Sequence, residues 1–196
     1  MNLRKIIKRT IKTGFLLLVL PVYTLYLLLC LTGTTDAVFM SFSQALSLIP
    51  GKTGIYIRAA FYRLACTDTS DEISVGFLTI FSHADTTIEK GVYIGPQCNI
   101  GKCSIGANSL LGSGVHVLSG KRQHEFSDES KLIQEQEGFF EKIKIGEDCW
   151  VGNTAVILCN VASKTIVGAN STVISTFERG SILVGNPAFV KNKRSL

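Results

Sequence analysis

The chain has 196 residues, of which 46% are hydrophobic and only 18% charged, so it can form one hydrophobic core with short attachments and is not disordered as a whole. Its formal net charge of +5 is concentrated at the two ends, and the middle of the chain is close to neutral. Because the middle has no basic stripe with interleaved aromatic residues, we expect no binding to nucleic acid.

The first 50 residues predict an attachment to a membrane. A 17-residue apolar run at residues 15–31 follows five basic residues, a pattern typical of membrane segments. The five are Arg4, Lys5, Lys8, Arg9 and Lys12. Pro21 can bend the helix, and a second apolar stretch at residues 37–49 can return to the same side, which favours a re-entrant or monotopic anchor. A two-pass hairpin is the alternative, although the second stretch is short for a full span.

Residues 51–72 predict a helix that links this anchor to the next domain. The stretch from Ile55 to Leu64 contains Arg58 and Arg63 among aromatic residues. This pattern fits an amphipathic helix in the membrane interface. It fits equally well a helix that caps the first coil of the following domain, and the two roles are compatible.

A six-residue repeat dominates the chain from about Ile73 to residue 190. Its aliphatic positions are Ile88, Ile94, Ile100, Ile105, Leu111, Val117, Ile145, Val151, Ile157, Val161, Val167 and Val173. A period of six suits three short strands per coil, joined by tight turns, with each aliphatic residue pointing into a shared core. The sequence therefore predicts an all-β domain, a parallel β-helix over residues 73–190, with a short basic tail at residues 191–196. We expect positive φ at its corners, at Gly106, Gly112, Gly152 and Asn170.

The six cysteines form no C-x-x-C pair and no metal-type spacing with histidine. We therefore expect reduced thiols and no metal site. Cys98 and Cys149 fall where the repeat needs a small, buried residue, so packing accounts for both.

Two further motifs accompany the repeats: Trp150-Val151-Gly152-Asn153, and the ending Val184-Gly185-Asn186-Pro187-Ala188. With them, residues 73–190 resemble the hexapeptide-repeat acyltransferases, most closely the O-acetyltransferases of serogroup, colanic-acid and sugar type. The resemblance implies a left-handed β-helix, an exception to the right-handed crossovers that physics favours. It also implies a homotrimer, acetyl-CoA or another acyl-CoA as donor, and a carbohydrate, polysaccharide or glycolipid hydroxyl as acceptor.

The repeat is interrupted by a polar loop at residues 120–142, where the resemblance places the active-site loop. Acyl transfer from a thioester to a hydroxyl needs a base that takes the hydroxyl proton, and histidine titrates in the right range. His124 lies in the loop, so we expect it to be the catalytic base, with His116 on the preceding rung as the alternate. Glu125, Asp128 and Glu129 are candidates to orient His124.

The resemblance also implies the remaining site residues. Gly152, Asn153, Ala169 and Asn170 would contact the pantetheine arm of acyl-CoA in a groove between subunits, and Lys191 would contact its phosphates, with Lys193 or Arg194 as substitutes. His116, Trp150 and Glu125 would line the acceptor pocket, although packing in the core explains Trp150 equally well. Because acyl-CoA is cytoplasmic, a single outward-going span would separate the site from its donor. We therefore expect the cytoplasmic face of a membrane and an anchor that is broken at Pro21.

Two other functions stay open from the sequence. The γ-class carbonic anhydrases use the same fold and bind a metal through three histidines, and this chain has His83, His116 and His124. The eight-residue gap between the last two is longer than the short spacer of that class. A β-helix that serves as a membrane scaffold without catalysis is the third hypothesis.

Overall fold

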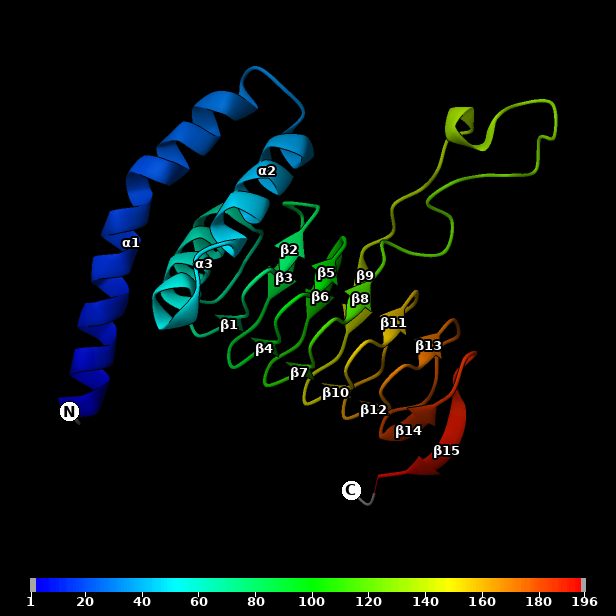
Figure 1. Ribbon diagram of the computed structural model, residues 1–196. Helices are drawn as coiled ribbons and strands as arrows, with labels where there is room; N and C mark the ends of the chain where they lie inside the picture. Colours follow the sequence, from blue (N-terminus) through cyan, green and yellow to red (C-terminus); the bar gives the residue numbers. More distant parts are fainter. Residues whose placement is uncertain (1–2, 195–196) are drawn as a thin grey trace.

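A computed structural model describes residues 3–194 of the chain, so residues 1–2 of the predicted anchor and 195–196 of the predicted tail lie outside the described part. Three helices come first, and a stack of coils built from short strands follows (Figure 1). The helices are α1 Leu3–Cys30, α2 Thr35–Ser47 and α3 Gly51–Ala65, and a 3-10 turn, η1 Ile133–Glu135, lies in the loop between β8 and β9.

The strands are mostly two residues long, one for each side of a triangular coil. They are β1 Ser74–Val75, β2 Ile80–Phe81, β3 Thr87–Ile88, β4 Tyr93–Ile94, β5 Asn99–Ile100, β6 Cys103–Ile105, β7 Leu110–Leu111, β8 His116–Val117, β9 Ile143–Ile145, β10 Trp150–Val151, β11 Val156–Ile157, β12 Ile166–Val167, β13 Thr172–Val173, β14 Ser181–Val184 and β15 Phe189–Lys193. As far as β11, every third strand joins the same sheet. In each two-residue strand the second residue is buried.

Three sheets form the sides of the stack. Their orders are β1-β4-β7-β10-β12-β14-β15, β2-β5-β8-β11-β13 and β3-β6-β9, and all pairs except β14–β15 are parallel. The repeat's aliphatic residues are buried in columns; in the first sheet Ile94, Leu111 and Val151 are paired in register. The predicted stack of parallel coils is confirmed. The all-β description fits residues 74–193, whereas most of residues 3–65 are helical.

The corner glycines serve a different purpose from the one predicted. Gly106, Gly112 and Gly152 do not have positive φ; the left-handed residues lie two positions later, at Asn108 and Thr154 among others. The glycines allow one coil to lie close to the next, because a Cβ at Gly152 would come within 2.5 Å of the Ala169 nitrogen. Among the four predicted corner positions, positive φ occurs only at Asn170.

Residues 191–194 are not a free tail. β15 turns back and pairs antiparallel with β14 through Lys193, beyond the predicted boundary at residue 190. Lys193 forms an ion pair with Glu178, and Arg194 forms one with Asp148 at 3.1 Å. Both cations therefore have partners within the coil stack.

The helix α1 is continuous through Pro21, so the predicted break is wrong. Pro21 is exposed, and its missing N–H removes a single helical hydrogen bond. The helix has 28 residues and is the one helix of residues 3–194 long and apolar enough to cross a membrane. One stripe, which includes Phe15, Val19 and Tyr26, packs against α2 and α3. The other sides expose leucines and isoleucines.

The helix α2 covers the open edge of the first coil, although its residues were predicted to return into the membrane. The backbone N–H of Leu78 donates to the Ser47 carbonyl at 3.0 Å, and that of Phe81 donates to Ser43 Oγ at 2.8 Å. An uncovered sheet edge would leave such groups without partners. Ser43 and Ser47 are four residues apart and lie on one face of α2. This face caps the first coil.

Arg58 of α3 is fully buried and does not face a membrane interface. Its Nε donates to the Val75 carbonyl of edge strand β1 at 3.0 Å, and its Nη1 donates to the carbonyls of Leu46 and Ile49 at 3.0 and 2.8 Å. Burial lowers the pKa of this guanidinium. Of the two roles predicted for residues 51–72, α3 has the contacts of a cap.

Candidate functional site

The loop that carries His124 leaves the stack after β8 and returns at β9 (Figure 1). Its two arms are paired: the Phe139 N–H donates to the Arg122 carbonyl at 2.7 Å, and the Glu125 N–H donates to the Glu137 carbonyl at 3.1 Å. These two bonds lie on either side of His124. The backbone of the histidine is therefore held in place, whereas its side chain is exposed.

Contacts with three coils fix the base of the loop. Lys121 Nζ donates to the Ile174 carbonyl at 3.0 Å, and the Glu141 N–H donates to the Ser119 carbonyl at 2.9 Å. Lys142 Nζ forms an ion pair with Asp85 at 2.6 Å, and this lysine holds the pKa of the Asp85 carboxyl below its usual range. The loop is therefore anchored at both ends even though its tip projects from the body.

A cavity of about 370 Å³ lies at the base of the loop, on the outer face of the sheet that contains β2, β5 and β8. His83, Asn99 and His116 line it from the coils, and Gln123 and Phe140 line it from the two loop arms. Asn99 and His116 are directly paired in register. The cavity thus brings Asn99 and His116 of the coils close to Gln123, the residue before His124.

His83 is held by two neighbours in this cavity. Its Nδ1 lies 2.8 Å from Ser82 Oγ, and its ring lies 5.1 Å from that of Phe140, measured between centroids. The structure therefore brings His83 and His116 into one cavity, while His124 does not line it within one chain. No group of three or more His, Cys, Asp or Glu side chains in residues 3–194 has an arrangement that could hold a metal ion.

The acids of the loop have partners other than His124. Glu125 Oε1 accepts from Arg122, and Asp128 accepts from Ser130. Hydrogen bonds from Ser130 and Lys131 lower the pKa of the Asp128 carboxyl. Glu129 is exposed at the surface of the loop. Within the described chain none of these three carboxylates has a hydrogen bond to His124, so the predicted orienting acid is not found.

The residues predicted to contact acyl-CoA gather at another corner of the stack. Gly152, Asn153, Ala169 and Asn170 lie on successive coils, and the Asn170 N–H donates to the Asn153 carbonyl at 3.0 Å. This corner connects the β10 and β11 sheets, whereas the loop leaves at the next corner. Lys191 is exposed on β15.

Trp150 is not a core residue, since 54% of its surface is exposed. It lies on the outer face of the first sheet, in register with Leu110 and Ile166. His116 lies on a different sheet. One chain therefore does not bring Trp150 and His116 into a common pocket.

Three of the residues that line the cavity, Asn99, Gln123 and Phe140, were not predicted as site residues from the sequence. Asn99 occupies the outward position one coil before His116, and the spacing of equivalent rungs could have identified it. Phe140 carries no such signal because it belongs to the irregular loop. Cys98 and Cys149 are buried, as predicted. Cys103 is buried too, and burial raises the pKa of its thiol to about 12.

Gly138 permits the close pairing of the loop arms, because a Cβ there would overlap the Gln123 carbonyl oxygen. Gly138→Ala is expected to push the arms apart and displace His124. If that histidine acts in catalysis, acyl transfer should fall by about 100-fold, because small displacements of a reacting group cost that much.

The matched control is Gly14→Ala, since nothing lies within 4 Å of a Cβ at that position. Transfer rates and far-ultraviolet circular dichroism of both variants check the expectation. An unchanged rate in Gly138→Ala would show that the paired arms do not position the catalytic group.

Known proteins show the same repeat. Residues 85–119 match the family described as bacterial transferase hexapeptide (six repeats). A probable macrolide acetyltransferase of Lysinibacillus sphaericus is 32% identical over 115 residues, which cover 53% of this chain and 64% of that protein. A putative colanic acid biosynthesis acetyltransferase of Escherichia coli K12, WcaF, is 26% identical over 113 residues, 55% of this chain and 58% of that protein. The chain thus spans about three fifths of the length of these relatives.

Solved structures show the same fold. A maltose O-acetyltransferase from Clostridium difficile 630 superposes with a TM-score of 0.70 at 17% identity, over 84% of this chain and 91% of that one. A galactoside acetyltransferase in complex with coenzyme A superposes with a TM-score of 0.60 at 15% identity, over 83% of this chain and 84% of that one. The chain is therefore a β-helical protein built of hexapeptide repeats. The predicted resemblance to the hexapeptide-repeat O-acyltransferases is confirmed.

Proposed function

We propose that this protein is an O-acyltransferase, of the O-acetyltransferase type, that moves an acyl group from acyl-CoA to a hydroxyl of a sugar, polysaccharide or lipid-linked glycan at a membrane. One observation carries the proposal: the regular coils are interrupted by a paired loop that carries His124, and the base of this loop lines a cavity together with Asn99 and His116. The acetyltransferases among its relatives support the same reaction class.

In the proposed reaction His124 accepts the proton of the acceptor hydroxyl while the hydroxyl oxygen attacks the thioester carbonyl. Backbone N–H groups of a coil stabilise the negative oxygen of the tetrahedral intermediate. The carbon–sulfur bond then breaks, the acyl group stays on the acceptor oxygen, and the leaving thiolate takes the proton from His124. No covalent intermediate on the protein is required, so the buried cysteines have no part in the reaction. His116 is the alternate base.

The donor and acceptor sites are proposed to form between subunits of a homotrimer of left-handed β-helices. Adjacent subunits would bring different faces together, so His124 of one subunit could face the corner with Gly152 and Asn170 of the next. Asn153, Ala169 and Lys191 would complete the acyl-CoA contacts. Trp150 and Glu125 would reach the acceptor pocket only in such an assembly.

The helix α1 is proposed to lie along the cytoplasmic face of the membrane without crossing it. Its buried stripe contacts α3 near Phe15 and both α2 and α3 near Tyr26, so the helix is attached to the body between these two residues. Its exposed sides present an apolar surface that suits a lipid interface. This placement leaves the catalytic loop in the compartment that holds acyl-CoA.

Calorimetric titration of the purified full chain with acetyl-CoA tests the proposal. We expect saturable binding with one site per subunit. The absence of any binding would instead favour a β-helical membrane scaffold without catalysis.

A further inference from the structure

A second cavity, of about 500 Å³, lies between α1, α3 and the first coils. We call it the α1 cavity. Its lining includes Lys8, Arg9, Lys12, Leu16, Lys52, Ile55, Tyr56, Arg63, Asp71 and Glu72. It shares no residue with the cavity beside the catalytic loop. The proposed acyl transfer gives it no role.

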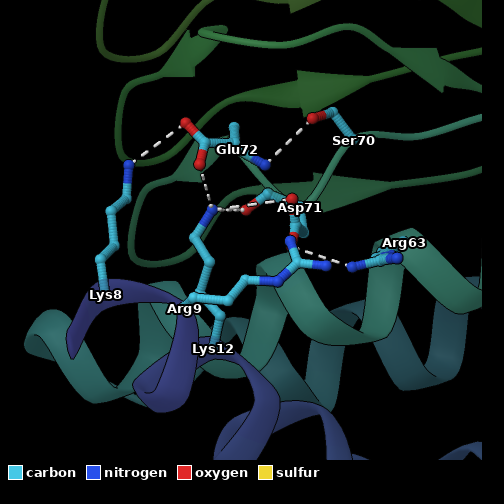
Figure 2. Close-up of polar contacts among 7 residues, drawn as sticks. All are labelled: Lys8, Arg9, Lys12, Arg63, Ser70, Asp71 and Glu72. Carbon is cyan, nitrogen blue, oxygen red and sulfur yellow. Dashed lines mark hydrogen bonds and ion pairs between the residues drawn. The ribbon is translucent and has the colours of Figure 1, made fainter. Parts of the chain in front are cut away.

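The lining of the α1 cavity is strongly basic. Five cationic residues line it, against two acids, which leaves an excess of three positive charges. Figure 2 shows the arrangement: Lys8 and Lys12 reach Glu72, while Arg9 and Arg63 converge on Asp71.

The acids orient the cations without neutralising all of them. Arg63 Nη1 lies 2.8 Å from Asp71 Oδ2, and Lys12 Nζ lies 3.2 Å from Glu72 Oε1. Hydrogen bonds from Lys8 and Lys12 lower the pKa of the Glu72 carboxyl. Lys52 is exposed and has no ion pair within residues 3–194. An anion among these donors would complete the charge balance, and clustered guanidinium and ammonium groups suit a phosphate.

The α1 cavity also has an apolar lining. Leu16, Ile55 and Tyr56 contribute aliphatic and aromatic surface from the two helices. The outward faces of α1 are also apolar and exposed, at Leu17 and Leu20 among others. A small inorganic anion would leave the apolar lining without a contact, whereas an amphiphile would contact both the charged and the apolar residues.

We infer that the α1 cavity binds a phosphate-bearing membrane lipid. The phosphate lies among Lys8, Lys52 and Arg63, and the apolar chain runs along Leu16 and Ile55. A lipid bound there would fix α1 on the bilayer by a headgroup contact in addition to the apolar contact of its exposed sides. The inference goes beyond the proposed reaction, and its test does not depend on acyl transfer.

The test is calorimetric titration of the full chain, in neutral detergent, with short-chain dihexanoyl phosphatidic acid. The variant Lys52→Glu reverses a charge on an exposed side chain that has no ion pair, so the fold should be unaffected. The matched control is Lys144→Glu, the same charge change at an exposed position of β9 outside the cavity. Saturable binding is expected for the unmodified chain, weakened about tenfold in Lys52→Glu and unchanged in Lys144→Glu.

Inorganic phosphate forms the second arm of the experiment. It should bind at least about tenfold more weakly than the short-chain lipid, because it lacks the apolar contacts. Equal affinity for both ligands would overturn the assignment of a lipid. Equal weakening by both lysine substitutions, or none by Lys52→Glu, would overturn the assignment of the cavity.

Discussion

Replacing His124 with alanine is expected to lower the rate of acyl transfer by about 10²- to 10⁴-fold, the usual contribution of a positioned general base. Two acids of the same loop are already engaged, Glu125 by Arg122 and Asp128 by Ser130, so we do not expect them to replace the lost base. Binding of acetyl-CoA should change little, because the base contacts the acceptor hydroxyl and not the donor. Steady-state kinetics with one purified acceptor measures the effect.

His116→Ala is the informative comparison for this variant, since His116 lies on the same sheet as Asn99 and lines the neighbouring cavity. We expect a smaller loss, confined mainly to the KM for the acceptor. If His124→Ala keeps full activity while His116→Ala loses it, the base is His116. The oligomeric state of each variant should be measured to separate chemistry from assembly.

Replacing Arg58 with methionine is expected to lower the free energy of unfolding by about 3 kcal/mol, because it removes three hydrogen bonds to backbone carbonyl groups. The three belong to Leu46, Ile49 and Val75, and two of these bonds connect α3 to the end of α2. Removing a buried charge also removes its desolvation cost, which offsets part of the loss. The loss of three partners outweighs that gain.

The matched control is Arg63→Met on the same helix. Arg63 is partly exposed and pairs with Asp71, and exposed ion pairs contribute about 0–1 kcal/mol. Urea denaturation of both variants in the same detergent gives the comparison. Equal stability of the two variants would contradict the structural role assigned to Arg58.

The coils could be predicted from the sequence because a period of six has a single physical explanation in an apolar chain. Burial of Ile94, Leu111 and Val151 in one column follows directly from that period. The roles of the glycines could not be predicted in the same way. Whether a glycine supplies positive φ or close approach depends on the neighbouring coil, which the local sequence does not contain.

The helices were harder to interpret for a related reason. An apolar helix face has the same composition whether lipid or protein covers it. Ser43 and Ser47 look like ordinary helix residues until the open strand edge beside them is known. Arg58 resembles an interfacial arginine for the same reason. Tertiary contacts decide between the two environments.

The site could be predicted in part. The interruption of the repeat singled out the loop and His124, since an irregular segment in a regular solenoid needs a reason. Asn99 became visible only when its register with His116 was known. Trp150 lies on another sheet than His116, so their joint role depends on a neighbouring subunit that a single sequence does not describe.

Mass spectrometry of surface glycans tests the central claim most directly, with cells that contain the protein, lack it, or carry His124→Ala. The account predicts a glycan heavier by one acyl group only in cells with the unmodified protein. Identical glycans in all three kinds of cell, with the protein present and assembled, would contradict it.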